Sequence, residues 1–347
     1  MKASKKVYVG MSGGVDSSVS AYLLKKQGYD VTGVFIRVWQ PEGGLCTWKD
    51  ERRDAMRVCA HLDIPFITLD LRDEYKKGVV DYMFREYSQG NVPNPDVMCN
   101  REVKFGAFWQ WAKKQGADYI ATGHYAQNID NKILEGIDKN KDQSYFLWTL
   151  EMYELAHILF PIGHLEKKDV RDIAKKTKIP VFDKKDSQGV CFIGQIDMKE
   201  FLKQNIETHR GDVLDKDGSI IGIHDGAVLY AIGERHGFEI FKNTNNQDRL
   251  YIVSKDIKNN TVTVDTEKSL DNTIDNTITA KNIVLRDGIE NIKTCRLRYR
   301  QEKVDIKSIE KDGEFLKVQL KNPEIYSKGQ SIVFYDGEVC VGGGVLM

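Results

Sequence analysis

The chain has 347 residues, of which 41% are hydrophobic and 29% charged, and its 51 Lys and Arg residues balance its 51 Asp and Glu residues. That length exceeds one typical hydrophobic core, so we expect an ordinary globular protein of two or three domains. Zero net charge excludes a globally basic nucleic-acid-binding surface, and we expect no membrane span and no signal or transit segment.

The first third of the chain alternates strand and helix patterns. We expect strands at 7–9, 31–38, 64–69 and 118–122, and helices at 17–27, 50–62, 74–87 and 105–115, with an Asn- and Pro-rich loop over 90–100. Gly28 stands where a helix-ending glycine is expected. The alternation predicts an α/β fold: a doubly wound parallel sheet, covered on both faces, with its ligand beyond the carboxyl ends of the strands.

In the remainder of the chain the regular alternation of strand and helix patterns gives way to short strand candidates. A charged helix is predicted over 165–178, before Pro180. Short strand candidates follow at 213–214, 220–223, 227–232, 282–285, 295–300, 315–320 and 331–335, a spacing typical of small β-barrels or sandwiches. We place a boundary in the Asn-, Asp- and Thr-rich stretch 259–279. The expected domains are a catalytic domain at 1–204, a small central β-rich domain at 205–268 and a C-terminal β-barrel at 269–347.

A glycine- and serine-rich string, residues 10–18 (GMSGGVDSS), joins the first predicted strand to the first predicted helix. Its glycines let the backbone approach phosphates, and the amides at the helix N-terminus form an anion site. Serine hydroxyls add donors, and Asp16 is the candidate ligand for Mg²⁺ on a bound pyrophosphate. No Gly-Lys-Ser/Thr is present, so the string is not a P-loop. The alternative is a turn with a capping serine, but the strand-loop-helix context favours an ATP-binding loop.

The six cysteines, at 46, 59, 99, 191, 295 and 340, form no Cys-x-x-Cys pair. A zinc ribbon or iron–sulfur site is therefore not expected, and neither is any other resident metal. So large a chain with scattered cysteines is typical of a reduced, cytoplasmic protein. We interpret Cys59, Cys295 and Cys340 as small buried residues, and Cys46 has no assignment.

Cys99 and Cys191 lie in unusual surroundings. Cys99 lies just before a predicted helix, and a helix N-terminus favours the thiolate form. Asp96, three residues earlier, is a candidate acid, base or hydrogen-bonding group for the same site. Cys191 lies between glycines in the string 189–194 (GVCFIG).

These strings together resemble the PP-loop ATP pyrophosphatase superfamily and, within it, the bacterial tRNA 2-thiouridylase (MnmA) family. The loop 10–18 carries the first resemblance, and the two cysteine strings, 94–100 and 189–194, carry the second. Further matches run in family order at 122–125, 141–147, 183–187 and 335–340. The resemblance implies a PP-loop ATPase domain of the adenine nucleotide alpha-hydrolase-like type, followed by two β-rich domains.

The resemblance also implies a reaction, ATP-dependent 2-thiolation of the wobble uridine in tRNAs with Lys, Glu and Gln anticodons. ATP adenylates the C2 oxygen with loss of pyrophosphate, and sulfur from a Cys191 persulfide then displaces AMP. Cys99 assists by attacking the persulfide, which leaves a transient Cys99–Cys191 disulfide. The sulfur would come from a cysteine desulfurase or a relay protein.

The resemblance also implies functional roles for individual residues, at the positions where this sequence matches the motifs of the family. The ATP-binding positions are Gly10, Met11, Ser12, Gly13, Gly14, Val15, Asp16, Ser17, Ile36 and Gly123. The positions near the target base are Asn94, Pro95 and Asp96. The other tRNA-contacting positions are His124, Lys141, Asp142, Gln143, Arg298, Tyr299 and Gln330. His124 could instead be a satisfied histidine at a strand end, and 141–143 a polar surface turn.

An argument independent of the family concerns the arginines at 296, 298 and 300. Alternate residues of a strand share a face, so these three predict a local basic stripe, flanked by Lys293 and Lys303, for RNA phosphates. Tyr299 is available for stacking, although it reaches the same RNA as Arg298 only near a strand end or bulge. The charged helix with Lys167 and Arg171 is a second candidate surface, or simply a solvated face.

Two other functions remain open at this point. One is a different PP-loop thiolase or ligase that adenylates another nucleobase or an amide, which would not need both cysteine strings. The other is a non-catalytic tRNA-binding protein that keeps an ATP-binding fold, which the intact loop and both cysteines argue against.

Overall fold

The computed structural model describes residues 4–41, 48–186, 198–241, 249–266 and 276–347. Its N-terminal part is built on a parallel sheet in the order β3-β2-β1-β4-β7. The strands are β1 Lys6–Gly10, β2 Asp30–Arg37, β3 Phe66–Asp70, β4 Tyr119–Ala121 and β7 Ile158–Leu159. The strand order reverses between β1 and β4, so a ligand site is expected at the carboxyl ends of these two strands.

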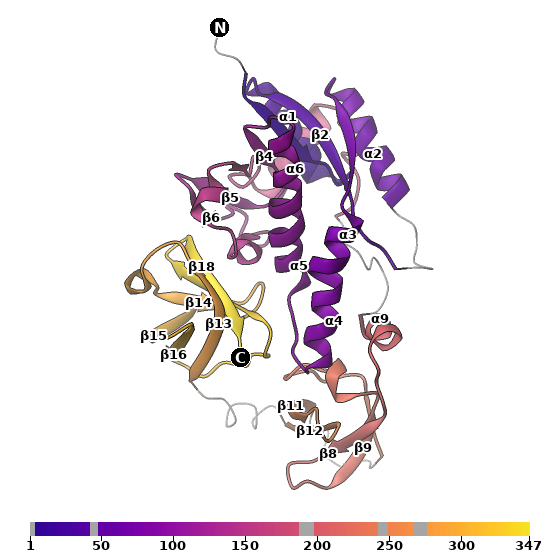
Figure 1. Ribbon diagram of the computed structural model, residues 1–347, viewed down its shortest axis with the longest axis vertical. Coiled ribbons are helices and arrows are strands. Elements are labelled where there is room, and N and C mark those ends of the chain that lie inside the picture. Colours follow the sequence, from indigo (N-terminus) through magenta and orange to yellow (C-terminus); the bar gives the residue numbers. More distant parts are fainter. Residues whose placement is uncertain (1–3, 42–47, 187–197, 242–248, 267–275) are drawn as a thin grey trace.

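Helices cover both faces of this sheet, which confirms the predicted doubly wound architecture (Figure 1). Val7 and Val9 of β1 face one core, and Tyr8 between them faces the other, as strand alternation requires. The first core includes helices α1 Val15–Lys26, α2 Trp48–His61 and α8 Lys167–Lys176. The second includes α3 Arg72–Tyr75, α4 Asp81–Ser88, α5 Pro95–Met98 and α6 Phe108–Lys114, with π-helical turns at Lys76–Val80 and Cys99–Ala107.

The predicted loop over 90–100 is wrong in its second half. Helix starts at Pro95 and continues through the π-helical turn into α6. Asn94 caps it, because its side chain accepts a hydrogen bond from the Val97 amide at 3.3 Å. Asn and Pro suggest a loop by composition, but an Asn cap followed by Pro in the first turn is also a favourable helix start.

A β-hairpin absent from the sequence prediction follows β4. Its strands are β5 Ala126–Ile129 and β6 Lys132–Glu135. Asp130 and Asn131 form the two-residue turn, with φ of 51° and 61°, a conformation that Asn and Asp tolerate. Short helices follow at Ser144–Leu147 and Met152–Leu155 (α7).

The C-terminal part is a closed β-barrel, as predicted. Its strands are β13 Thr277–Leu285, β14 Thr294–Arg296, β15 Val304–Asp312, β16 Phe315–Leu320, β17 Ser331–Asp336 and β18 Val339–Leu346, with a short helix at Ile289–Asn291. Pairing of β13 with β18 closes the barrel. β6 also pairs with β18, so the hairpin of the N-terminal part extends the sheet of the barrel (Figure 1).

The central part holds a second sheet, in the order β10-β9-β8-β12-β11, reached through α9 Met198–Asn205. Its strands are β8 Gly211–Leu214, β9 Ile220–His224, β10 Phe238–Ile240, β11 Leu250–Asp256 and β12 Thr261–Thr266. The predicted strand at 227–232 is wrong, because Ala227–Leu229 forms a short 3₁₀ helix after Gly226, whose φ is 137°. The domain limits 1–204, 205–268 and 269–347 stay a proposal.

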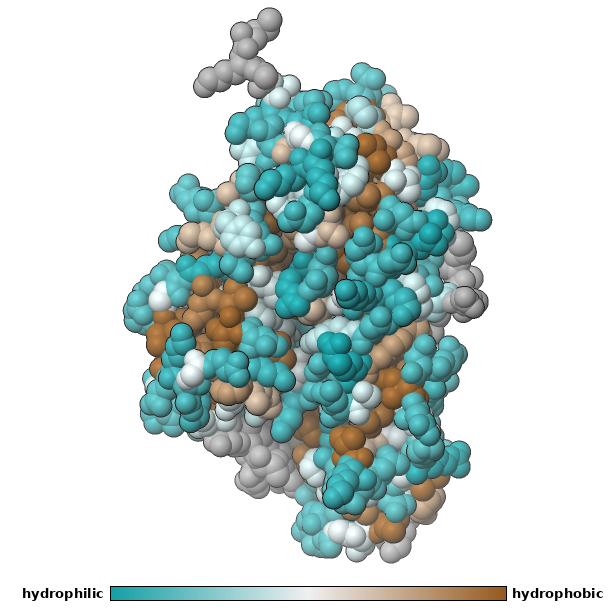
Figure 2. All heavy atoms as spheres, in the orientation of Figure 1, coloured by the Kyte–Doolittle hydropathy of each residue, from teal (hydrophilic) through white to brown (hydrophobic). Residues whose placement is uncertain are grey.

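Hydrophilic side chains cover most of the face shown in Figure 2, and hydrophobic ones gather over the barrel and in smaller patches elsewhere. Among the described residues, no helix combines the length and the apolar character that crossing a membrane requires.

Candidate active site

The loop after β1 is folded onto itself by short polar contacts. The Ser12 amide donates to Ser17 Oγ at 3.2 Å, and Ser18 Oγ donates to the Gly14 carbonyl at 2.7 Å. Gly13 has a φ of 74°, and a Cβ there would lie 2.4 Å from the Glu51 carbonyl oxygen of α2. Only glycine fits at this point, so the loop is held between the sheet and α2 at the N-terminus of α1.

The end of β4 lies against this loop. A Cβ on Gly123 would be 2.8 Å from the Ser17 amide nitrogen, so the backbones of the two segments are in direct contact. The structure thus brings the predicted ATP-binding residues 10–17 together with Gly123 at the reversal point of the sheet. Met11 and Val15 are buried core residues, and the Met11 amide donates to the Val34 carbonyl at 2.8 Å. Ile36 is half-buried near the end of β2.

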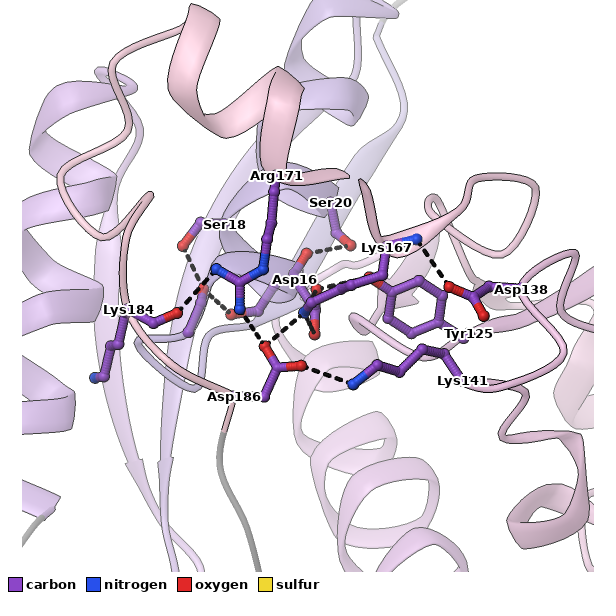
Figure 3. Close-up of polar contacts among 12 residues, drawn as sticks. Asp16, Ser18, Ser20, Tyr125, Asp138, Lys141, Lys167, Arg171, Lys184 and Asp186 are labelled. Atoms are coloured by element: carbon purple, nitrogen blue, oxygen red, sulfur yellow. Dashed lines mark hydrogen bonds and ion pairs between the residues drawn. The ribbon is translucent and has the colours of Figure 1, made fainter. Parts of the chain in front are cut away.

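A charge cluster lies beside the loop (Figure 3). Lys167, the first residue of α8, places its Nζ 2.6 and 2.8 Å from the two carboxylate oxygens of Asp16. The Tyr125 hydroxyl donates to the same carboxylate at 2.9 Å, and burial raises the pKa of Tyr125, with Asp16 adding to the effect. Lys184 donates to the Gly13 carbonyl at 3.1 Å and pairs with Asp54 at 2.8 Å.

Asp186 connects three cations of this cluster. Its carboxylate lies 2.7 Å from Lys141 Nζ, 2.9 Å from Lys167 Nζ and 2.7 Å from Arg171 Nη2. Burial opposes ionisation of Asp186, but the hydrogen bonds from Lys141 and Lys167 outweigh it and lower its pKa to about 2. The cluster therefore keeps charged groups of both signs beside the phosphate loop.

Asp16 has the donor chemistry of a Mg²⁺ ligand, but both of its carboxylate oxygens are bonded to Lys167 Nζ and one also to the Tyr125 hydroxyl, so a metal ion brought by a nucleotide would have to displace Lys167. Mg²⁺ is usually held by one or two carboxylates together with substrate phosphates. The Asp16 carboxylate is 32% exposed and lies at the N-terminus of α1, among serine hydroxyls. Within the described ranges, no group of three or more acidic, His or Cys side chains could hold a metal ion without such phosphates.

Cys99 and Asp96 lie on one helix, three residues apart and so on one face. The predicted position of Cys99 at a helix N-terminus is wrong, because the helix already begins at Pro95. The helix dipole acts mainly over the first turn, so it stabilises the thiolate form of Cys99 little. Cys99 is 3% exposed, and burial raises the pKa of Asp96 although Lys104 opposes the shift.

Cys191 lies outside the described residues, as does Cys46. Its proposed pairing with Cys99 therefore stays a prediction. The other three cysteines are buried, as predicted, and burial raises the pKa of Cys59 and of Cys295 to about 12.

Two predicted tRNA contacts do not fit the geometry. His124 is 6% exposed between Phe105 and Phe160, and its Nδ1 lies 2.7 Å from Thr122 Oγ1, so it is a satisfied histidine at a strand end. Asp142 is 3% exposed, and its carboxylate accepts hydrogen bonds from the Gly136 and Ser144 amides. Neither side chain offers RNA an accessible surface in this conformation.

The neighbours of Asp142 are better placed. Lys141 is partly exposed and bonded to Asp186, while Gln143 accepts a hydrogen bond from the Tyr125 amide. Gln330 is half-buried in the barrel, where its carbonyl accepts from the Leu346 amide.

The predicted basic stripe is also wrong in its geometry. The strand ends at Arg296, and residues 297–300 form a turn in which Arg300 has a φ of 64°. Arg296 is ion-paired and mostly buried, whereas Arg298 and Arg300 are exposed. Tyr299 packs on Phe146 with ring centroids 4.4 Å apart. Arg298 and Tyr299 thus lie just past a strand end, the condition under which both can reach one RNA.

Sequence reasoning missed Lys167, Tyr125, Asp186 and Lys184 as parts of the site. Lys167 meets Asp16 across 151 positions of the chain. No local pattern marks such a pair, and Lys167 reads as one of several lysines on a solvated helix. Tyr125 offered the better signal, because it follows the strand that ends beside the phosphate loop.

Comparison with known proteins covers nearly the whole chain. Family models described as "tRNA methyl transferase HUP domain", "tRNA methyl transferase PRC-barrel domain" and "Aminomethyltransferase beta-barrel domain" match residues 5–195, 199–266 and 276–346. The tRNA-specific 2-thiouridylase MnmA of Listeria monocytogenes is 41% identical over 98% of this chain and 94% of its own, and that of Bacillus velezensis is 43% identical over the same shares. The solved U34-tRNA thiolase NcsA of Methanococcus maripaludis aligns at a TM-score of 0.36 and 16% identity, covering 58% of this chain and 63% of that one, too weak a likeness to support an argument.

Proposed function

The chain belongs to the tRNA-specific 2-thiouridylase family, and we propose that it uses ATP to replace the C2 oxygen of the wobble uridine of tRNA with sulfur. The descriptions of the matching family models mention methyl transfer, whereas the relatives' names specify 2-thiouridine. Two cysteine strings suit sulfur chemistry, because a persulfide requires a thiol to carry it and a second thiol can release it. The observation that carries the proposal is the contact of residues 10–17 with Gly123 at the reversal point of the sheet.

The first half of the reaction belongs to this loop. The α-phosphate of ATP would lie at the N-terminus of α1, where backbone amides and serine hydroxyls meet it. The uridine C2 oxygen would attack it, and pyrophosphate would leave. Asp16, once released by Lys167, would hold the Mg²⁺ of the nucleotide, which would neutralise phosphate charge. Lys167 and Lys184, which lie against Asp16 and the Gly13 carbonyl, would stabilise the departing pyrophosphate.

The second half belongs to the cysteines. Adenylation converts a poor leaving group into AMP, and sulfur delivered from a Cys191 persulfide would attack C2. Cys99 would attack the persulfide to release its sulfur, closing a Cys99–Cys191 disulfide that an external reductant reopens. Asp96, with Asn94 and Pro95, would lie near the target base. Because burial raises its pKa, Asp96 is better suited to donating a hydrogen bond or proton than an exposed aspartate.

The finer assignments rest on the resemblance. They are a preference for tRNAs with Lys, Glu and Gln anticodons, a persulfide donor of the cysteine desulfurase or relay type, and a cytoplasmic location. We propose direct RNA contacts for Lys141, Gln143, Arg298, Tyr299 and Gln330, and not for His124 or Asp142.

The decisive experiment incubates tRNA with the protein, ATP, Mg²⁺ and a persulfide donor, followed by mass spectrometry of the nucleosides. The wild type should produce 2-thiouridine. Cys99→Ser and Cys191→Ser should each abolish it but retain ATP-dependent adenylation, while Cys59→Ser, matched in chemistry, should retain both. Normal thiolation by either of the first two variants would contradict the two-cysteine mechanism. Adenylation of another nucleobase or an amide would instead favour a different PP-loop enzyme.

A further inference from the structure

A buried charge cluster joins the N-terminal part of the molecule to the barrel. Glu135 ends β6, Asp142 lies in the segment after it, and Arg296 ends β14. Arg296 Nη1 is 2.8 Å from Asp142 Oδ2, and Nη2 is 2.9 Å from Glu135 Oε1. The side chains of Glu135 and Asp142 are 4% and 2% exposed, and that of Arg296 is 14% exposed. One guanidinium thus donates a hydrogen bond to Asp142 and forms an ion pair with Glu135, both in another part of the molecule.

Further groups complete this cluster. Lys303 Nζ lies 2.9 Å from Glu135 Oε1, and the Tyr335 ring lies beneath both cations, 5.1 Å from the Arg296 guanidinium and 4.6 Å from Lys303 Nζ. Burial opposes ionisation of Glu135, but hydrogen bonds from Lys303 and Lys139 outweigh it and lower its pKa.

Such a cluster is costly to bury. Removing charges from water costs nearly as much as their mutual attraction returns, so buried ion pairs are weak evidence for stability. A short charged hydrogen bond, such as that from Arg296 to Asp142, instead fixes the relative position of the parts it joins. The relative position of the two parts that Arg296 joins is therefore more informative about function than the stability of its ion pairs.

Both ends of the Arg296–Asp142 pair adjoin segments proposed to contact tRNA. Asp142 lies between Lys141 and Gln143. Arg296 precedes the turn that carries Arg298 and Tyr299. The 2.8 Å contact therefore ties one segment to the other across the boundary between the hairpin and the barrel.

We propose that Arg296, acting through Asp142 and Glu135, is a positioning residue. It holds the segments 141–143 and 298–299 at a fixed distance from each other, so that a single tRNA engages both at once. The inference rests on the proposed function, because it takes both segments as RNA-contacting. Contacts on two linked segments reinforce each other only while their spacing matches the ligand. Arg296 itself gives RNA little to bind, since two carboxylates already occupy its guanidinium.

The first test compares Arg296→Met with Lys321→Met. Both remove one cation from the barrel, but Lys321 forms an exposed pair with Asp305 within the barrel. We expect Arg296→Met to raise the KM for tRNA about tenfold or more, because a changed spacing of the two segments weakens the binding of RNA alone. The kcat and the KM for ATP should stay within about twofold of wild type. Lys321→Met should leave all three constants unchanged. Equal effects of the two substitutions would overturn the proposal.

A double-mutant cycle then separates positioning from general destabilisation. In the wild-type background Arg298→Ala should raise the KM for tRNA about fivefold or more, whereas after Arg296→Met it should raise it less than about twofold, because the turn is already misplaced. An undiminished effect of Arg298→Ala in the Arg296→Met background would overturn the proposal, since a merely structural role leaves that contact intact.

A second variant covers the case in which Arg296→Met fails to fold. Asp142→Asn retains the shape and one carbonyl oxygen while removing the charge that faces Arg296. The same cycle with Arg298→Ala should again be non-additive, and additivity would overturn the proposal.

Failure of the proposed function would look different. A wild-type protein that binds tRNA but forms no 2-thiouridine would overturn that function, and the cycle would then be measured on the Kd for tRNA. Non-additivity there would still support the positioning role, and additivity would overturn it. A wild-type protein that binds no tRNA would overturn both.

Discussion

His124 shows what a single residue at the site contributes when it does not contact substrate. Its ring fills the space between Phe105 and Phe160 and bonds to Thr122. Burial lowers its pKa well below the ordinary value of 6.5, and Lys104 adds to the shift. The folded protein therefore keeps this ring neutral at a pH where the unfolded chain protonates it.

That difference predicts a pH dependence of stability. The stabilisation from neutral His124 is complete above pH 6.5, and it is lost progressively as the pH falls from 6.5 toward the lowered pKa of the folded state. Urea unfolding at pH 7.5 and pH 5.5 should show a smaller loss on acidification for His124→Gln than for wild type. The same substitution at the exposed His209 should keep the wild-type pH dependence. Equal losses for all three proteins would contradict the prediction.

At the scale of elements, the site depends on how closely β4 approaches the start of α1. A methyl group on Gly123 would lie 2.8 Å from the Ser17 amide nitrogen and 2.9 Å from the Asp16 carbonyl carbon, both backbone atoms that cannot turn away. Gly123→Ala should therefore displace the N-terminus of α1 and raise the Kd for ATP about tenfold or more, because amides at that end bind the phosphates. Calorimetric titration of ATP measures the effect.

Gly116→Ala provides the contrast. Gly116 has a φ of 80°, but nothing lies within 4 Å of its missing Cβ. Alanine there should cost about 1 kcal/mol of stability through backbone strain and leave ATP affinity unchanged. If both variants lose ATP affinity equally, the contact between Gly123 and the loop does not determine how tightly ATP binds.

At the scale of the whole molecule, the barrel has a core of its own, but one side of it packs into the core of the N-terminal part. Trp148 is 2% exposed, and its Nε1 donates to Ser331 Oγ of β17 at 3.0 Å. A Cβ on Gly343 would lie 2.8 Å from the Trp148 ring. The hairpin strand β6 pairs with β18 in the same region. We infer that these two parts unfold together.

Ser331→Ala tests this inference. It leaves the buried Trp148 Nε1 without its acceptor and should lower the free energy of unfolding by about 1–3 kcal/mol. Tryptophan fluorescence and far-UV circular dichroism should report one shifted transition. Ser308→Ala, at an exposed barrel serine bonded to Gln319, should change the midpoint little. Two separate transitions, with only one of them moved by Ser331→Ala, would show that the parts unfold independently.

The sequence alone predicted the features that adjacent residues encode. The phosphate loop, the order of strands and helices around it and four of the six described barrel strands follow from periodicity, glycines and turns within a few positions, whereas β15 and β18 are absent from the sequence prediction. Most element limits are confirmed within a few residues. The errors arise where a local signal is ambiguous, as at Asn94-Pro95, where the same residues suit a loop or a capped helix.

Only the tertiary structure decided which charges meet. Arg296 appears from its spacing to be one of three arginines facing RNA, yet it ends its strand and binds Asp142 and Glu135, which lie more than 150 positions away. Lys167 and Asp16 are separated by a similar distance in sequence. Charge pairing depends on distances of about 3 Å between side chains, and periodicity along the chain carries no information about such contacts. The fold could therefore be predicted largely from the sequence, whereas the division of basic residues between structure and RNA could not.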